Sequence, residues 1–97
     1  MPYSIVWSPR AFNTFVQVTE YLGKKWTGRE VEKVIERTEE VLAHIKNNPL
    51  QYIYSKDLKA YRSVITKQVS LLYQVEEESI ELLVFWDTRQ DPGKLKM

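Results

Sequence analysis

Two apolar segments near the end of the chain restrict its fold more than any other feature. They span residues 69–75 and 80–86, are rich in β-branched and aromatic residues, and each has the length of a typical strand. The acidic run from Glu76 to Ser79 separates them, which predicts an antiparallel hairpin. Because successive side chains of a strand alternate between its two faces, every second residue of each segment should lie on one buried face. That predicted face consists of Val69, Leu71, Tyr73, Val75, Ile80, Leu82, Val84 and Trp86.

The opposite face of the predicted hairpin is mixed. It contains Leu72, Leu83 and Phe85 together with polar residues. This is more apolar surface than a soluble protein leaves exposed without a function. We therefore expect a ligand or a partner on this face.

The totals indicate one soluble domain, residues 1–97, with an ordinary composition of 43% hydrophobic and 28% charged residues. No apolar run approaches the roughly 20 residues that span a membrane, and the N-terminus has no signal-peptide pattern. The absence of cysteine excludes disulfides, thiolate metal sites and a cysteine nucleophile. A single histidine, His44, cannot build a histidine-rich metal site and is expected to be structural. These features favour a cytoplasmic protein without a metal or cofactor.

Charge is segregated along the chain although the net charge is only +1. Four basic residues fall within twelve positions that contain one acid, Asp57; they are Lys56, Lys59, Arg62 and Lys67. The acidic residues gather in the helical region and in the hairpin turn. Such a distribution can create a locally positive surface, or it can simply keep the protein soluble.

The first half of the chain has the pattern of two helices. A short strand at 3–7 precedes Ser8-Pro9, a good helix start, and the first apolar stripe ends at Gly23, the expected cap. Thr27 and Glu30 fit a capping box that opens a second helix, which Asn47-Asn48-Pro49 ends. The short connection predicts an antiparallel helical hairpin, with Trp26 packed between the helices. The apolar stripes comprise Ala11, Phe15, Val18 and Leu22, with Phe12 beside them, and then Val31, Val34, Ile35, Val41, Leu42 and Ile45.

The remaining segments complete the expected fold. Residues 50–59 read as a loop and 60–66 as a strand that turns at Lys67-Gln68 into the hairpin. The order strand, helix, helix and three strands predicts an α+β domain, an antiparallel sheet (β-α-α-β-β-β) with the helical hairpin on one face. The uncovered face of that sheet should present Arg62, Val64, Leu72, Leu83 and Phe85 together.

Several short motifs occur in this order at the element boundaries. They are Trp7-Ser8-Pro9-Arg10-Ala11, Asn48-Pro49, Tyr61-Arg62, Leu72-Tyr73-Gln74-Val75 and Trp86-Asp87-Thr88-Arg89-Gln90-Asp91-Pro92. In order and spacing the chain resembles the RelE/ParE superfamily, the toxins of type II toxin–antitoxin (plasmid stabilisation) modules. The resemblance implies a RelE-like fold and a small cytoplasmic toxin with no membrane partner. It also implies a cognate antitoxin that is encoded next to the toxin and whose C-terminal segment wraps the toxin. The toxin is then expected as a homodimer or as a heterotetramer with the antitoxin.

The superfamily has two activities, and both remain open. RelE-like members are mRNA interferases that cut messenger RNA on the ribosome without a metal, whereas ParE-like members inhibit DNA gyrase. Metal-free cleavage needs a base, an acid and cations for the phosphorane. If the chain is such an endoribonuclease, the resemblance and the local charge indicate Arg62, Arg89, Lys59 and Lys67 as catalytic residues.

The departures from the nuclease pattern favour the ParE-like activity. Val64 and Ser70 stand where active nucleases have basic residues, and Leu95 is nearest to the position of an expected tyrosine. Arg62 could instead pair with Glu81, and Arg89 with Asp91 or Asp87. A fold relic without toxicity is a third reading. We expect the antitoxin to bind the apolar residues of the uncovered face, which are Leu72, Leu83, Phe85 and Val64.

Overall fold

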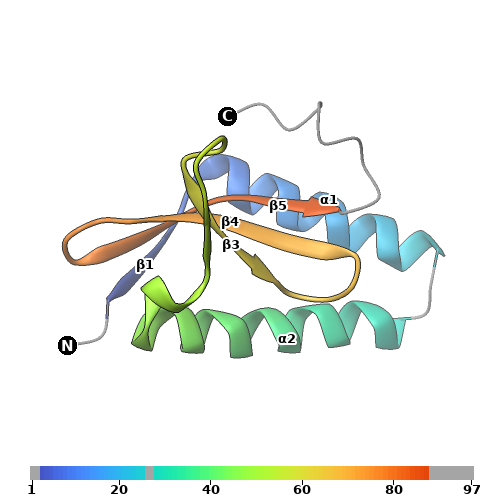
Figure 1. Ribbon diagram of the computed structural model, residues 1–97. Helices are drawn as coiled ribbons and strands as arrows, with labels where there is room; N and C mark the ends of the chain where they lie inside the picture. Colours follow the sequence, from blue (N-terminus) through green and yellow to red (C-terminus); the bar gives the residue numbers. More distant parts are fainter. Residues whose placement is uncertain (1–2, 26–27, 88–97) are drawn as a thin grey trace.

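The computed structural model describes residues 3–25 and 28–87. A five-stranded sheet with the order β1-β5-β4-β3-β2 carries two helices (Figure 1). The elements are β1 (Ser4–Trp7), α1 (Pro9–Lys25), α2 (Gly28–Asn47), a 3₁₀ turn η1 (Pro49–Gln51), β2 (Ile53–Ser55), β3 (Ala60–Val64), β4 (Val69–Val75) and β5 (Ser79–Asp87). The predicted α+β architecture is confirmed.

Two features of the sheet differ from the prediction. The segment expected to be a loop contains β2, which pairs antiparallel with the first three residues of β3. At three residues, β2 is too short to show an alternating pattern. The other difference is β1, which pairs with β5 in parallel. The sheet is therefore mostly, not wholly, antiparallel.

The start of α1 is confirmed in detail. The hydroxyl of Ser8 accepts a hydrogen bond from the Ala11 N–H at 3.0 Å, which satisfies one of the unpaired donors of the first turn. Pro9 occupies the first helical position, where its missing N–H costs nothing. The prediction for Gly23 is wrong, because α1 continues through it to Lys25. The predicted capping residue Thr27 and the connection residue Trp26 lie outside the described residues.

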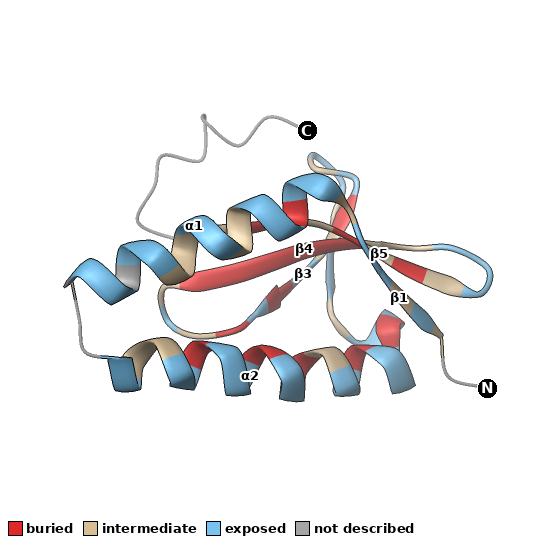
Figure 2. Ribbon diagram, turned by 180° about the vertical axis from the view of Figure 1, so that it is seen from behind, coloured by how far each residue is buried: buried red, intermediate tan, exposed pale blue. Residues whose placement is uncertain are grey.

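The main core lies between the two helices and one face of the sheet. Both helices contribute buried side chains, and β4 is buried along most of its length between them (Figure 2). The fully buried cluster comprises Ala11, Val41, Ile45, Ile65, Val69, Leu71, Tyr73, Ile80, Leu82 and Phe85. Most of the predicted buried face of the hairpin is therefore confirmed.

A β-bulge in β5 reverses the predicted faces at the end of the hairpin. Tyr73 pairs with Leu82, but the preceding residue Leu72 pairs with Val84, so Leu83 has no partner on β4. One extra residue shifts the alternation, because side chains switch faces at every residue. Leu83 keeps its predicted side, against the smaller cluster, and from Val84 onward the side chains of β5 lie on the faces opposite to those predicted.

Phe85 is the residue most affected by the bulge. It was expected on the uncovered face, but it is 2% exposed and belongs to the main core beneath α1. Its ring packs 4.9 Å from that of Phe15 and 5.4 Å from that of Trp7, centroid to centroid. Val84 and Trp86, both expected in the main core, lie instead on the face away from the helices, since they pair with Leu72 and Ser70.

Two polar side chains of α1 and its cap satisfy backbone groups next to the bulge. The Ser8 hydroxyl donates to the carbonyl oxygen of Leu83 at 3.2 Å. The Phe85 N–H donates to the Thr14 hydroxyl at 2.9 Å. Because an unpaired buried backbone group is costly, these two bonds stabilise the bulged register.

A second, smaller cluster covers part of the face away from the helices. Leu72, expected to be exposed there, is fully buried with Ala60 and Val84. Leu58, in the turn between β2 and β3, packs against them. This turn includes Lys59 in the left-handed region, with φ of 55°, a conformation that costs a lysine of order 1 kcal/mol or more. The face that was expected to be bare is therefore half covered by the chain itself.

Tyr73 gives the stability of this core a dependence on pH. Its hydroxyl donates to the Pro49 carbonyl at 2.6 Å, and burial, with smaller contributions from Tyr52 and Tyr61, raises its pKa well above the ordinary value. A raised pKa means that this stabilisation is complete below about pH 10 and is lost as the pH rises further. We expect Tyr73→Phe to lower the free energy of unfolding by about 1–2 kcal/mol at pH 7. Urea unfolding at pH 7 and above pH 10 should show this difference narrowing; a constant difference would contradict the assignment.

Candidate functional surfaces

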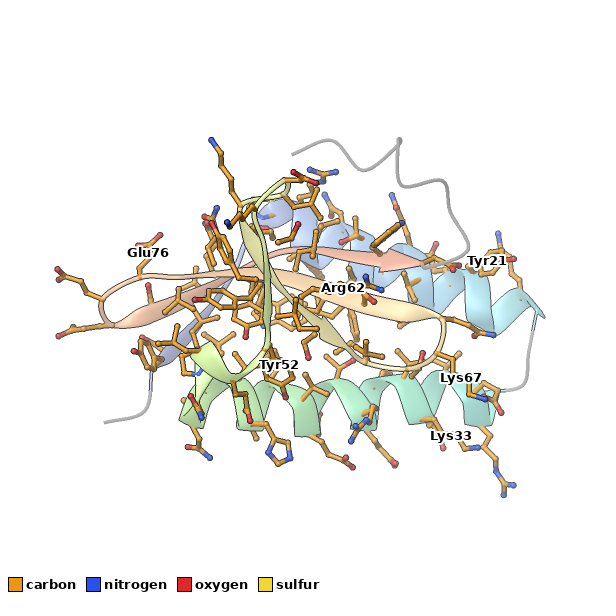
Figure 3. The ribbon with its side chains drawn as sticks, viewed as in Figure 1. Tyr21, Lys33, Tyr52, Arg62, Lys67 and Glu76 are labelled. Atoms are coloured by element: carbon orange, nitrogen blue, oxygen red, sulfur yellow. The ribbon has the colours of Figure 1, made fainter. Side chains whose placement is uncertain are left out.

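The described cations of the predicted nuclease set do not come together. Lys59 precedes β3 and Lys67 follows it, so the length of a five-residue strand, roughly 17 Å, separates them. Each of the three side chains lines a different hollow. Arg62 lies near the middle of α2 and Lys67 near Lys33 (Figure 3), whereas Lys59 lines a third hollow together with Glu76. Arg89, the fourth candidate, lies outside the described residues.

Arg62 is exposed on β3 and has an aromatic neighbour. Its guanidinium carbon lies 5.8 Å from the centroid of the Trp86 ring, within the range of a cation–π interaction. The suggested pair with Glu81 is not present, because Glu81 faces Gln74 in the register while Arg62 faces Leu72. Within the described part of the chain, Arg62 has no ion pair.

Arg62 lines a groove of about 480 Å³ between α2 and the β2–β3 edge of the sheet. We call it the edge groove. Its other lining residues are Arg37, Val41, His44, Gln51, Tyr52, Ile53 and Val64. The sequence analysis missed Arg37 and did not connect His44 with Arg62. Arg37, Val41 and His44 follow each other at helical spacing and so share one face of α2, a signal that was present in the sequence.

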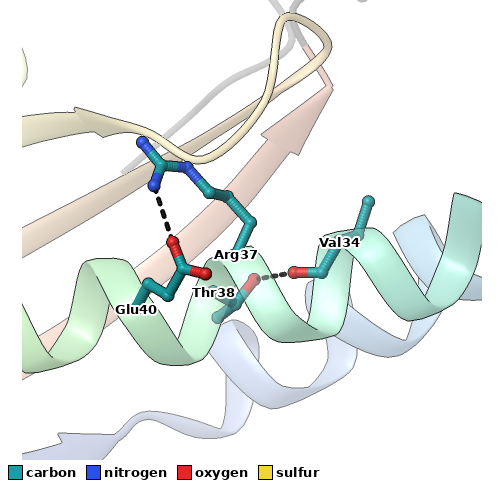
Figure 4. Close-up of polar contacts among 4 residues, drawn as sticks. All are labelled: Val34, Arg37, Thr38 and Glu40. Carbon is teal, nitrogen blue, oxygen red and sulfur yellow. Dashed lines mark hydrogen bonds and ion pairs between the residues drawn. The ribbon is translucent and has the colours of Figure 1, made fainter.

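Arg37 makes an ion pair inside its own helix. Its guanidinium lies 2.9 Å from the Glu40 carboxylate (Figure 4), and both side chains are more than half exposed. An exposed pair three residues apart contributes little to stability. Arg37 can therefore exchange Glu40 for another carboxylate at small cost.

Of the four residues predicted to bind the antitoxin, two reach the surface. Val64 is 56% exposed, and Leu83 is half-buried against the smaller cluster. Leu72 and Phe85 are buried for the reasons given above, so the four side chains do not form one apolar surface.

A group of exposed apolar side chains lies on the helical side. A hollow of about 410 Å³, the helix groove, is lined by Trp7, Phe12, Phe15, Val16, Thr19 and Ile35. Phe12 is 51% exposed, and Trp7 and Ile35 are each 40% exposed. Trp7 and Phe15 touch edge to face at 5.5 Å and both pack on Phe85, so two of the lining rings are held from below. From the sequence, Ile35 was placed in the apolar stripe of the second helix and Phe12 beside that of the first, because both are near the buried positions of their helices.

Two further kinds of feature are absent from residues 3–25 and 28–87. No helix there is long and apolar enough to cross a membrane. No group of three histidine or acidic side chains is arranged to hold a metal ion.

Comparison with solved structures identifies the class of fold. The chain is similar to the chromosomal ParDE toxin–antitoxin system of P. aeruginosa, with a TM-score of 0.72 and 12% identity over 88% of this chain and 95% of that one. It is also similar to the YoeB dimer of Staphylococcus aureus, with a TM-score of 0.60 and 20% identity over 89% and 97% of the two chains. The YoeB–YefM complex of the same organism gives a TM-score of 0.60 at 19% identity, over the same shares. At such low identities, these TM-scores establish a shared fold and nothing more.

The family follows from the sequence itself. Residues 5–92 match the family described as the ParE toxin of the type II toxin–antitoxin system parDE, and the chain belongs to this family. It is thus the toxin of a toxin–antitoxin module, as its resemblance to the superfamily implied. No curated protein sequence matches the chain.

Proposed function

We propose that this toxin inhibits DNA gyrase by binding to it and does not cleave RNA. The separation of Arg62, Lys59 and Lys67 into three hollows carries the proposal. Phosphorane charge is stabilised only by groups within a few ångströms of the reacting phosphate, so this separation argues against joint action of these cations on one phosphate.

The immediate neighbours of Arg62 also support binding over catalysis. Across the register it faces Ile53 and Leu72, and Val64 follows it on the same side of β3. None of these apolar side chains can take or give a proton, and His44, which lines the same groove, cannot serve as base and acid in one step, whereas cleavage by the 2′-hydroxyl needs both. An exposed arginine among apolar groups is typical of a protein-binding surface.

The antitoxin, in this proposal, covers the helix groove with an amphipathic helix. Apolar side chains of such a helix fit a groove of this kind. The α2 rim is acidic: Glu32 and Glu39, three positions before and four after Ile35, share its side of the helix and are exposed. The docking helix should therefore carry basic residues beside its apolar stripe. Leu83 remains a candidate for a contact with the rest of the antitoxin; Val64, the other exposed residue of the predicted set, lines the edge groove instead.

Assays of DNA supercoiling and of messenger RNA cleavage distinguish gyrase inhibition from RNA cleavage. The purified toxin should inhibit supercoiling of relaxed plasmid by gyrase, and messenger RNA mapped from induced cells should stay intact. Cuts in messenger RNA that follow the codon phase and disappear in Arg62→Ala and Arg89→Ala would replace the proposal with the RNA-cleaving alternative. Growth without arrest under induction would indicate a fold without toxicity.

A further inference from the structure

We propose that the edge groove is the surface that contacts the target, and that it takes an extended protein segment with acidic and apolar residues. This inference rests on the proposed function for the identity of the target, DNA gyrase. It concerns a different surface from the helix groove assigned to the antitoxin.

The positive charges of the edge groove favour a partner with carboxylate groups. Arg62 lines it without an ion pair in the described part of the chain, and Arg37 lines it from α2 with only an exposed partner. His44 lies along the same face of α2 and adds a further nitrogen donor. Arg37 from α2 and Arg62 from β3, whose guanidinium now lies beside the Trp86 ring, line one groove. They favour a segment that carries at least two acidic side chains, since a guanidinium binds a carboxylate with two parallel hydrogen bonds.

The apolar lining of the edge groove indicates that the partner contributes apolar side chains as well as acidic ones. Val41, Ile53 and Val64 line it between the arginines. Ile53 is 79% exposed and Val64 56% exposed, so both offer apolar area that is still in contact with water. A partner with apolar residues between its acidic residues would bury this area.

The backbone at the groove favours an extended partner. β2 is the outermost strand of the sheet and pairs only with residues 60–62 of β3. Ser63 and Val64 therefore continue β3 beyond the end of β2, at an edge of the sheet beside α2. Such an edge can pair with the main chain of an added segment.

A protein segment fits the groove better than a nucleic acid. A nucleic acid backbone is recognised by many cations along its path, but the edge groove has two arginines, and the exposed Glu36 and Glu40 flank Arg37 on α2. These carboxylates repel a run of phosphates. Separate acidic side chains of a peptide can reach the arginines and avoid Glu36 and Glu40.

The polarity of the two grooves assigns them to different partners. Long-lived interfaces are more apolar than transient ones. The helix groove, with its exposed aromatic rings, suits an antitoxin that stays bound, and the edge groove, with its charged walls, suits a target that the toxin meets only when it is free. Glu40 then acts as an internal competitor, because it occupies Arg37 until a carboxylate of the target replaces it.

The test measures binding of each purified gyrase subunit to the immobilised toxin by biolayer interferometry. We expect Arg62→Glu and Arg37→Glu each to weaken binding at least about ten-fold, and Glu40→Gln to strengthen it about two- to five-fold by freeing Arg37. Lys56→Glu is the matched control: it makes the same charge change in the β2–β3 turn, at an exposed residue outside the groove, and should stay within about two-fold. Equal losses for Lys56→Glu and Arg62→Glu, or no loss for Arg62→Glu with an unchanged urea midpoint, would overturn the proposal.

Failure of the proposed function gives a different result from failure of this inference. If gyrase does not bind the unaltered toxin, the same variants are scored by growth arrest and by antitoxin binding. Arrest lost in Arg62→Glu but kept in Lys56→Glu, with antitoxin binding unchanged in both, supports the edge groove as the contact with another target. Salt-dependent binding of RNA or DNA to the toxin that is lost in Arg62→Glu and Arg37→Glu would assign the groove to nucleic acid and overturn the inference.

Discussion

Replacement of Phe85 by alanine is expected to lower the free energy of unfolding by about 3–5 kcal/mol, the usual cost of removing a buried phenylalanine. The ring is 2% exposed and packs against Trp7 and Phe15 beneath α1. A small domain has roughly 5–15 kcal/mol of stability in total, so this variant should be partly unfolded at 37 °C. Urea unfolding followed by circular dichroism measures the change.

Val64→Ala is the control for this measurement. Val64 is exposed on β3, and we expect its replacement to change the free energy of unfolding by no more than about 0.5 kcal/mol. Thr14→Val removes the acceptor of the Phe85 N–H and should cost about 1–3 kcal/mol. If Phe85→Ala and Val64→Ala proved equally mild, Phe85 would lie on the solvent side and the bulge at Leu83 would be absent.

The double variant Phe12→Ser/Ile35→Ser is expected to reduce affinity for the antitoxin at least about one hundred-fold, which corresponds to roughly 2.7 kcal/mol. Both side chains line the helix groove from opposite helices and are largely exposed, so they contribute little to folding and much to an apolar interface. Isothermal titration calorimetry with the cognate antitoxin measures the loss.

Val6→Ser provides the matched control for the helix groove. Val6 is about as exposed as Phe12 and belongs to β1, but it does not line the groove. Its replacement should leave antitoxin affinity within about three-fold. An unchanged affinity in the Phe12 and Ile35 double variant would move the antitoxin to another surface, and Val64 and Leu83 would be the next residues to replace.

Much of the fold is predictable from local patterns in the sequence. Ser8-Pro9 predicts the start of α1 and Asn47 the end of α2, because caps and proline act within one turn of the residues they affect. The bulge at Leu83 is different. It depends on the hydroxyls of Ser8 and Thr14, about seventy residues earlier, and neither residue marks the insertion in the sequence. A shift of one residue then moved Phe85 into the core.

The candidate surfaces were harder to predict than the fold. Arg62 was correctly predicted to be exposed on a strand. That it lines a groove together with Arg37 and His44 could not be predicted, because this depends on how α2 packs beside the sheet edge. The apolar stripes of α1 and α2 are each wider than the buried face they supply, and Phe12 and Ile35 form the excess. Periodicity assigns a residue to a side of a helix, but it does not distinguish the centre of the buried side from its margin.

The packed rings of Trp7, Phe15 and Phe85 support the fold, and in the proposed antitoxin complex Trp7 and Phe15 also line the binding groove, which would restrict how the toxin can diverge from related toxins. A mutation that altered Trp7 or Phe15 to exclude a foreign antitoxin would also loosen the support of β5. Phe12, Val16 and Ile35 are free of that constraint. Toxin–antitoxin pairs that coexist in one cell should therefore gain specificity for their own partners through substitutions at these three positions, while Trp7, Phe15 and Phe85 are retained.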